Sequence, residues 1–272
     1  MSSPHGYAVD PTDPRAPSME LWDAMTASER KAVVDALPSD IESTSPPEGD
    51  PHRIPKQRAL EALDAFFKRK GRQIYLSNEL PVYYPGEGMF APDVIAVLDV
   101  DPKERLRWVV ADEGKGLDFV LEVTFHGSRQ KDLALNVGRY AALGIPEYFV
   151  FDRMQQRIYG WRLAGSAHYE AIVPQFGRWK SEVLDLELAV ESARVRFYTG
   201  TAVVPELAEL VTRANAIVDN LQDRVAMAEA RAEEEKLRAE EEKARAEEEK
   251  LRAEEEKARA EEEKLRAEEE KA

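Results

Sequence analysis

From Ala230 to its end, the chain repeats a single seven-residue unit, [A/L]RAEEEK, almost without variation. From Arg238 on, each arginine of the repeat follows a glutamate by four residues, as Arg238 follows Glu234. Such pairs each stabilise an isolated helix by about 0.2–0.5 kcal/mol, and the other residues are good helix formers. We therefore expect residues 230–272 to form one solvated charged helix, about 60 Å long at 1.5 Å per residue. A partly frayed tail is the alternative, and in either form the segment is a spacer rather than a site of chemistry.

Apolar residues just before the repeat follow a heptad pattern. They are spaced alternately by four and three residues: Leu207, Val211, Ala214, Val218, Leu221, Val225 and Ala228. This spacing predicts a short coiled coil over residues 205–229, and with it a homodimer. Beyond Ala230 the same register places alanines at one core position and glutamates at the other, so the apolar seam ends there. The repeat itself indicates no particular protein partner for the charged helix.

The net charge of −15 belongs to the two ends of the chain. Residues 1–50 hold three Lys or Arg against ten Asp or Glu, and residues 229–272 hold twelve against nineteen, so each end carries −7. Residues 51–228 hold 23 against 24 and are nearly neutral. This distribution argues against a basic protein that coats DNA non-specifically, but it allows a nucleic-acid site within the middle of the chain.

The sequence predicts a soluble, cytoplasmic protein that does not enter a membrane. No stretch approaches the roughly 18 consecutive apolar residues of a membrane span. The N-terminus has neither the basic start nor the apolar run of a secretory signal. The chain contains no cysteine, which excludes disulfides and thiolate metal sites and fits a reducing compartment.

Residues 1–50 are rich in proline, serine and acidic residues, and we expect this region to be mostly disordered. One short helix is predicted within TASERKAVVDALP. Thr26 and Glu29 have the spacing of a capping box at its start, and Pro38 follows its end.

Residues 51–204 combine helical and strand patterns. Helical spacing brings Leu60, Leu63 and Phe67 to one face of a first helix, and a second helix is predicted over residues 130–143. Short apolar segments predict strands: QIYLSNELPVYY, DVIAVLDV, RWVVA, LDFVLEVTF and EYFVFD, then an antiparallel extension of IYGWRLA, HYEAIV, SEVLDLEL and RVRFYTG. The fold class is therefore α/β (α+β), with a mixed sheet flanked by helices.

Two acidic residues lie in or beside the most apolar strands. Asp93 opens DVIAVLDV, and Glu122 lies inside LDFVLEVTF between Leu121 and Val123. A carboxylate in such surroundings is costly unless a cation or hydrogen bonds compensate it. On adjacent strands the two acids would form an oxygen site suited to Mg²⁺, which polarises a phosphodiester and activates water. Alternatively, Asp93 is only a turn residue and Glu122 pairs with an arginine such as Arg139.

The order of these elements resembles the PD-(D/E)XK nuclease superfamily, and more closely the bacterial Uma2 (Uma-two) family of restriction endonucleases. The matching stretches are LPVYYPGEGMFAPDVIAVLD, DFVLEVT and RQKDLALNVGRYAALGIPEYFVFD. The resemblance covers about residues 52–200 and extends into the charged helix. It implies a restriction-endonuclease-like fold, cleavage of DNA, and an Mg²⁺ (or Mn²⁺) ion held by Asp93 and Glu122. The backbone carbonyl of Val123 is a further implied metal ligand.

The chain departs from the superfamily at its catalytic lysine. Thr124 stands where the superfamily has a lysine, two residues after the glutamate. Relatives in the family often carry a lysine on the next helix, but that position is Asn136. Neither side chain supplies the positive charge that offsets the charge of the phosphorane. Lys131 is the candidate substitute and Lys115 a second, although neither occupies a matching position, so catalysis is expected to be weakened or lost.

Three more residues have a functional and a structural interpretation. His126 follows the strand of Glu122 and would contact metal or phosphate, but a loop histidine is more often incidental. His52 precedes the first helix and is most simply a surface residue. Glu61 lies on that helix, where related nucleases sometimes supply a further acid, although a solvated helix face is the favoured interpretation.

The same two interpretations apply at the ends of the helices. The basic residues Lys68, Arg69, Lys70 and Arg72 either contact DNA phosphates or complement the negative end of the first helix. Asp132 is expected to interact with the dipole of the second helix, and Tyr140 to pack against the sheet.

The preferred function is that of an Mg²⁺-dependent endonuclease acting on DNA. A homodimer formed through residues 205–229 would join two sites by a two-fold axis and so cut both strands. The alternative is a catalytically inactive nuclease fold, retained as an interaction or DNA-binding module assembled through the C-terminal helix.

Overall fold

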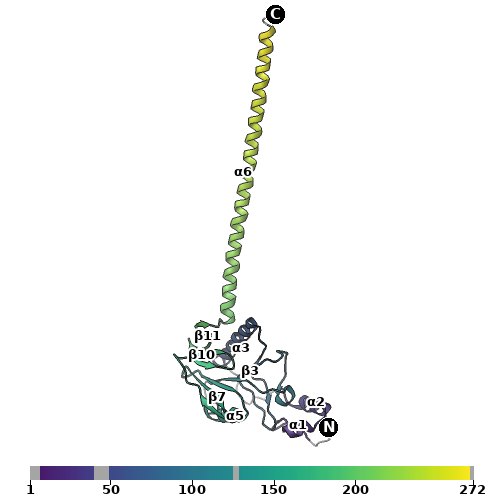
Figure 1. Ribbon diagram of the computed structural model, residues 1–272, viewed down its shortest axis with the longest axis vertical. Coiled ribbons are helices and arrows are strands. Elements are labelled where there is room, and N and C mark those ends of the chain that lie inside the picture. The colour runs from purple at the N-terminus through teal and green to yellow at the C-terminus, as the bar shows by residue number, and fades with distance from the viewer. Residues whose placement is uncertain (1–6, 40–48, 125–128, 270–272) are drawn as a thin grey trace. The chain divides into compact units, whose positions relative to one another are not determined.

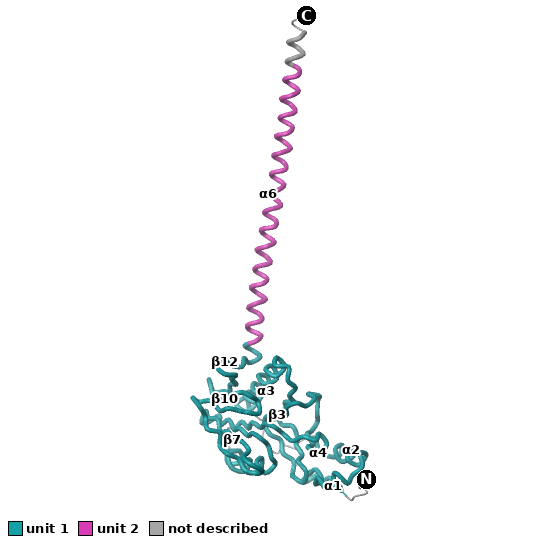
Figure 2. Tube along the Cα trace, viewed as in Figure 1, with its two compact units in different colours: residues 1–209 teal, residues 210–272 magenta. Residues whose placement is uncertain are grey.

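A computed structural model describes residues 7–39, 49–124 and 129–269, with side chains to residue 262. The chain forms two compact units, residues 1–209 and residues 210–272 (Figure 2). Within the described residues, no helix is both long and apolar enough to span a bilayer.

Helices and strands of the first unit follow one another along the chain as Figure 1 shows. In order they are α1 (Met19–Ala24), α2 (Ala27–Ala36), α3 (Asp50–Lys70), β1 (Ile74–Ser77), β2 (Val82–Tyr83), β3 (Val94–Leu98), β4 (Trp108–Val109), α4 (Val110–Glu113), β5 (Phe119–Thr124), the π-helical turn η1 (Lys131–Leu135), α5 (Asn136–Ala142), β6 (Glu147–Asp152), β7 (Arg157–Ala164), β8 (His168–Ala171), β9 (Trp179–Ser181), β10 (Leu186–Glu191), β11 (Arg194–Thr199) and β12 (Ala202–Val203). The expected mixed sheet with flanking helices is therefore confirmed.

The central sheet has six strands in the order β1-β3-β5-β6-β7-β8. β5 and β6 run parallel, and every other pair in this sheet is antiparallel. The parallel pair needs a crossover, which η1 and α5 provide. β3, β5 and β6 are buried along their whole length, as the apolar segments predicted.

Each face of the central sheet is covered. Leu121 and Val123 of β5 belong to a core that includes the apolar side of α3. Val120, one residue earlier, belongs to a second core with Tyr140 of α5. Side chains alternate between the faces of a strand, so Glu122 points to the side of α5. The acid therefore lies in an otherwise apolar layer.

The four strands expected to extend the central sheet are divided between two sheets. β7 and β8 continue the central sheet, whereas β9–β12 form a separate antiparallel sheet in the order β12-β11-β10-β9. The expected strand SEVLDLEL is divided between β9 and β10 by a turn in which Asp185 has a left-handed backbone (φ 54°). Leu188 and Phe197 of the second sheet pack into the core of α3.

The N-terminal region differs from the expected disorder within the residues that the structure describes. It contains two helices rather than one, and the capping box of Thr26 and Glu29 is confirmed at the start of α2. Trp22 and Met25 are buried in a third core, against Tyr83 and other residues. Burial of these large side chains orders a segment whose composition alone suggested a flexible tail.

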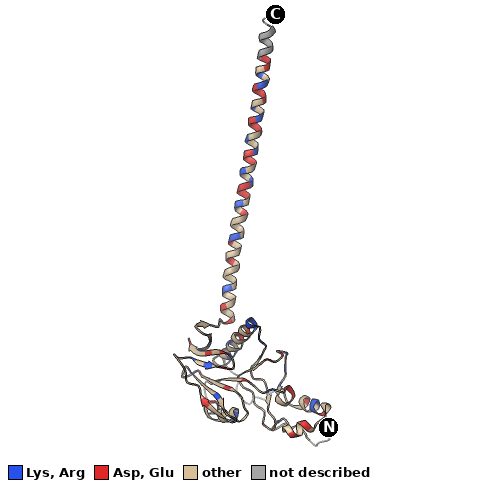
Figure 3. Ribbon diagram, viewed as in Figure 1, with Lys and Arg blue, Asp and Glu red and all other residues tan. Residues whose placement is uncertain are grey.

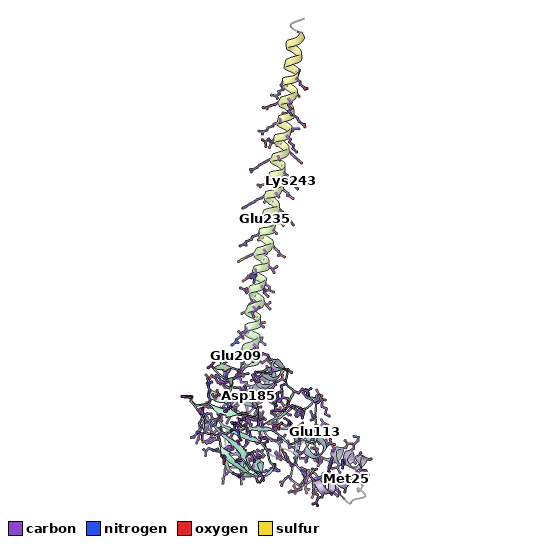
Figure 4. All side chains as sticks on the ribbon, viewed as in Figure 1. Met25, Glu113, Asp185, Glu209, Glu235 and Lys243 are labelled. Atoms are coloured by element: carbon purple, nitrogen blue, oxygen red, sulfur yellow. The ribbon has the colours of Figure 1, made fainter. Side chains whose placement is uncertain are left out.

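The second unit is part of one continuous helix, α6 (Leu207–Glu269), of 63 residues. At 1.5 Å per residue the helix is about 95 Å long. Lys and Arg alternate with Asp and Glu along it (Figure 3), and side chains such as Glu235 and Lys243 stand out from it (Figure 4). The predicted pair of Glu234 and Arg238 is present, so the solvated charged helix is confirmed for the described part of the repeat.

Candidate functional site

Asp93 and Glu122 lie side by side on one face of the central sheet. In the antiparallel register, Val94 pairs with Leu121, so the next step places Asp93 opposite Glu122. Directly opposed residues of an antiparallel pair point to the same side. The Asp93 N–H donates a hydrogen bond to Glu122 Oε2 (3.1 Å), and the Val123 N–H donates one to Asp93 Oδ2 (2.7 Å). The two strands thus bring both carboxylates to one place.

The surroundings shift the two acids in opposite directions. Burial, and then the charges of Asp93 and Asp132, raise the pKa of Glu122 to about 8. Burial also acts to raise the pKa of Asp93, but a hydrogen bond and charge from His52, together with the charge of Lys56, hold that pKa below its ordinary value. Without a bound cation, the site at neutral pH therefore holds an ionised Asp93 and a protonated Glu122.

Lys56 of α3 brings an ammonium group to the acid pair. Its Nζ lies 3.5 Å from Asp93 Oδ1 and forms an ion pair with Glu79. The side chain of Lys56 is only 2% exposed. A charged lysine at this depth requires carboxylate partners, and Asp93 and Glu79 are those partners.

His52, one turn before Lys56 on α3, also reaches the site. Its Nε2 lies 3.3 Å from Asp93 Oδ2. The sequence alone favoured a surface position for this residue, but its side chain is only 22% exposed. Asp93 is therefore held by α3 on one side and by the Val123 N–H of β5 on the other.

A proline and an arginine fix the first turns of α3. Pro55 has no N–H, so the carbonyl of Pro51 lacks its usual helical donor. The Arg153 guanidinium donates a hydrogen bond to that carbonyl (2.6 Å). The N–H of Arg153 donates to the carbonyl of Thr124 at the end of β5 (3.0 Å). Arg153 thereby connects the strand of Glu122 with the helical turns that hold His52 and Lys56.

On the opposite side, Tyr140 of α5 contacts Glu122, and Asp132 of η1 lies near enough for its charge to act on that acid. The Tyr140 hydroxyl donates to Glu122 Oε1 (2.9 Å), so Tyr140 reaches the acid in addition to packing on the sheet. Asp132 is buried and accepts a hydrogen bond from the Asn136 amide (3.2 Å). Its charge is among those that raise the pKa of Glu122, so Asp132 belongs to the surroundings of the site rather than to an exposed helix end.

The residues at the two superfamily lysine positions lie near the acid pair, whereas the lysines considered as substitutes do not occupy those positions. Thr124 is buried on the same side of β5 as Glu122, and Asn136 is occupied with Asp132. Lys131 is exposed on η1, with no contact to either acid among the described residues. Lys115 pairs with Asp118 and donates to the carbonyl of Leu98, at the other end of β3.

Other residues weighed from the sequence also lie elsewhere. Arg139 donates to the carbonyl of Gly88 and stacks on Phe90, so it does not pair with Glu122. Glu61 accepts a hydrogen bond from Gln57 along the side of α3. The basic residues Lys68–Arg72 are exposed at the far end of α3, where Lys68 pairs with Asp64 and Arg72 with Asp99. His126 falls outside the described residues.

A hollow of about 630 Å³ adjoins Lys56. It lies between α3 and the turn that carries Asn78 and Glu79, and Arg53 and Gln57 contribute to its walls. The side chain of Glu79 is 47% exposed. The hollow therefore borders the ion pair of Lys56 and Glu79, while Asp93 and Glu122 do not line it.

The donor set fits a magnesium ion that retains water and substrate ligands. Among the described residues, no three His, Asp or Glu side chains converge as a metal cage. Mg²⁺ is commonly held by one or two carboxylates with waters and phosphate oxygens, and Asp93 and Glu122 supply two. Each carboxylate oxygen of Glu122 accepts one hydrogen bond, which leaves a second lone pair on each for a cation.

The sequence pattern indicated the two acids and the packing of Tyr140, but not Lys56, Glu79 or the contact of Tyr140 with Glu122. Lys56 continues the apolar stripe of α3, three residues before Ala59 and seven before Leu63. A lysine at an otherwise apolar helical position was therefore the available signal. Glu79 carried no such signal, because its role depends on a turn whose position the pattern did not predict.

Comparison with known proteins identifies a family. A family model described as "Uma2: Putative restriction endonuclease" matches residues 35–208, which is well over half of the chain. Among solved structures, a putative nuclease belonging to DUF820 from Anabaena variabilis ATCC 29413 is similar, with 15% sequence identity and a TM-score of 0.42. The match covers 57% of this chain and 85% of that chain. No curated protein matches.

Proposed function

Because the chain belongs to the Uma2 family of putative restriction endonucleases, we propose that it hydrolyses DNA phosphodiester bonds with an Mg²⁺ ion at Asp93 and Glu122. The observation that supports this most strongly is the pairing of the two acids across β3 and β5, on one face and joined by reciprocal backbone hydrogen bonds. Two carboxylates in contact among apolar residues repel each other when both are charged, and a bound divalent cation would remove that repulsion. A PD-(D/E)XK-like role accounts for it.

Each residue of the site has its own proposed role in an in-line hydrolysis. Asp93 and Glu122 would hold the ion, with the Val123 carbonyl as a further ligand, and the Tyr140 hydroxyl orients Glu122. Such an ion, when bound, would polarise the phosphodiester and lower the pKa of an attacking water. The water oxygen bonds to phosphorus as the bond to the leaving oxygen breaks; the water gives up one proton to the solvent, and the leaving oxygen takes one up from it. Thr124 occupies the position of the superfamily lysine without its charge.

Metal binding and cleavage test the proposal together. We expect calorimetric titration with Mn²⁺ or Mg²⁺ to show binding that Glu122→Ala abolishes, and a plasmid-nicking assay to show activity that Glu122→Gln lowers by at least about 100-fold. Glu170→Gln, an exposed acid on β8, is the matched control. Absence of binding at millimolar metal would exclude the proposed site.

A second candidate function is a binding module without turnover. It is favoured by the loss of lysine at Thr124 and Asn136, the two positions where relatives carry it. Metal or DNA binding without detectable nicking, under conditions in which a related nuclease cuts, would select this function.

The first turns of α6 suit a second copy of the same chain. The seam places Val211, Val218 and Val225 at one core position and Leu207 and Leu221 at the other. Valine at the first position with leucine at the second is typical of parallel two-stranded coiled coils. These five side chains are each 46–56% exposed, so the seam is open in the single chain.

Charges beside the seam favour the same parallel arrangement. In that register Arg224 of one copy lies opposite Glu229 of the other, five residues further along, as interhelical ion pairs require. One heptad later, Arg231 would face Lys236, and Glu235 would enter the core. The dimer contact is therefore confined to residues 207–229, and the charged repeat is left as two separate helices.

A further inference from the structure

Lys56 is the only lysine of the described residues whose ammonium group lies between carboxylates at the acid site. We propose that this ammonium is a cation built into the site, which supplies the positive charge that Thr124 and Asn136 do not. The inference deepens the proposed nuclease function and rests on it. Lys56 contacts Asp93 and Glu79, so its proposed role is that of a fixed charge beside the metal ligand Asp93.

The placement of Lys56 on α3 is as rigid as that of a core residue. Its side chain is 2% exposed and shares the helix face of Ala59 and Leu63, which pack on the central sheet. Arg153 fixes the start of the same helix through the carbonyl of Pro51. The charge of Lys56 is therefore held in place before any ligand binds, as electrostatic preorganisation requires.

Glu79 holds the ammonium from the side of the hollow. Its backbone is left-handed (φ 51°), an unfavourable conformation for a residue other than glycine. Its N–H donates to the carbonyl of Pro92 (2.9 Å), directly before Asp93. The strained turn and the Pro-Asp segment are thereby joined, so the two carboxylates that flank Lys56 keep a fixed spacing.

Asp93 does not depend on Lys56 for its position. The Val123 N–H donates to its Oδ2, and His52 Nε2 lies 3.3 Å from the same oxygen. Removing the ammonium should therefore leave the metal ligands in place and change mainly the charge around them. This separates the proposed role from a purely structural one, because the two predict opposite changes in metal affinity.

The test replaces Lys56 and its counter-ion in the full chain and measures Mn²⁺ affinity by calorimetry beside plasmid cleavage. Lys56→Met removes the charge while filling the same space. We expect Mn²⁺ to bind about 10-fold more tightly, or about 1.4 kcal/mol, because a repelling charge is gone. Cleavage at saturating metal should fall by at least about 100-fold. Lys31→Met, an exposed ion-paired lysine on α2, is the control and should change neither quantity.

A loss of metal affinity together with activity in Lys56→Met would overturn the inference, as would unchanged affinity. If that variant does not fold, Glu79→Gln tests the inference instead. This variant should fold, because the side chain of Glu79 is half-exposed. Its loss of a negative charge should weaken Mn²⁺ binding about 3- to 10-fold, and unchanged binding would refute the inference. A wild-type chain that binds Mn²⁺ but cuts no DNA would remove the nuclease proposal, while the affinities would still decide the role of Lys56.

Discussion

Glu122 and Asp93 are carboxylic acids in contact, yet their surroundings shift their pKa values in opposite directions. Burial and the charges of Asp93 and Asp132 disfavour the charged form of Glu122, and they outweigh the Tyr140 hydrogen bond, which favours it. Asp93 faces His52 and Lys56, which favour its charged form. A bound divalent ion removes the penalty on Glu122. Metal uptake at neutral pH should therefore release a proton.

The raised pKa of Glu122 makes stability depend on pH. Between about pH 4.5 and 8 the folded chain keeps a proton that the unfolded chain releases, so the free energy of unfolding falls as pH rises. Glu122→Gln should remove this fall and be more stable than wild type above pH 8, by about 2–5 kcal/mol without metal. The lowered pKa of Asp93 affects stability only at more acidic pH, outside this window.

Chemical denaturation at several pH values, with and without Mg²⁺, measures the effect. Saturating Mg²⁺ should restore the wild-type stability that is lost at pH 8, but not alter Glu122→Gln. Glu170→Gln should keep the wild-type slope. Equal slopes for wild type and Glu122→Gln would contradict the assigned pKa.

A substitution at Tyr140 tests the hydrogen bond that Glu122 accepts from α5. Tyr140→Phe keeps the ring packing and removes the hydroxyl that donates to Oε1. We expect a loss of about 1–2 kcal/mol in unfolding free energy and about 10-fold lower cleavage. Tyr169→Phe removes a similar hydroxyl that donates to the Ile145 carbonyl. This control should lose stability but keep its activity, and an equal loss of activity in both variants would deny Tyr140 a specific role.

For single residues, the sequence predicted the two acids but not the lysine that lies beside Asp93. Asp93 and Glu122 were visible because a charge inside an apolar strand is conspicuous. Lys56 lies in a segment with many charged residues, and the direction of its side chain depends on how α3 docks. Tyr140 was expected to pack, which it does, but the partner of its hydroxyl requires the three-dimensional position of Glu122.

At the level of elements, the start of α3 depends on Arg153, which follows β6 and also donates a hydrogen bond to the end of β5. Arg153→Met removes the hydrogen bond to the Pro51 carbonyl, which has no other helical donor because of Pro55. Hydrogen–deuterium exchange over residues 49–56 should become faster, unfolding free energy should fall by about 1–3 kcal/mol, and cleavage should weaken about 10-fold. Arg157→Met, an arginine at the start of β7 that stacks on Tyr159, should leave exchange in α3 unchanged.

Element types were predicted better than their ends. Continuous apolar runs predicted β3, β5 and β6, because strands covered on both faces leave such a pattern. RWVVA was expected to be a strand, but only Trp108 and Val109 pair before the chain turns into α4. The second sheet was not foreseen, since strand periodicity does not specify which sheet a strand joins.

For the whole molecule, the open seam of α6 predicts a dimer that one charge should disrupt. Val218→Asp would bury an unpaired carboxylate in the seam, so light scattering should report the mass of one chain instead of two. Leu237→Asp changes an equally exposed apolar residue of the same helix outside the seam and should leave the dimer intact.

Removal of residues 230–272 separates the seam from the repeat. The shortened chain should remain dimeric, because the expected contact ends at Glu229. A monomer would show that the repeat holds the copies together and would contradict the assignment of the seam.

The ammonium beside Asp93 comes from a helix that precedes both acids along the chain, whereas the superfamily pattern seeks a lysine after them. A text search that requires acid, acid and lysine in that order would reject such chains as inactive. A comparison of residues that are neighbours in space would retain them, with the lysine in the first turns of α3 counted beside the two acids. If the lysine has moved between these two positions, related sequences should carry it either at the position of Lys56 or at that of Thr124, and seldom at both.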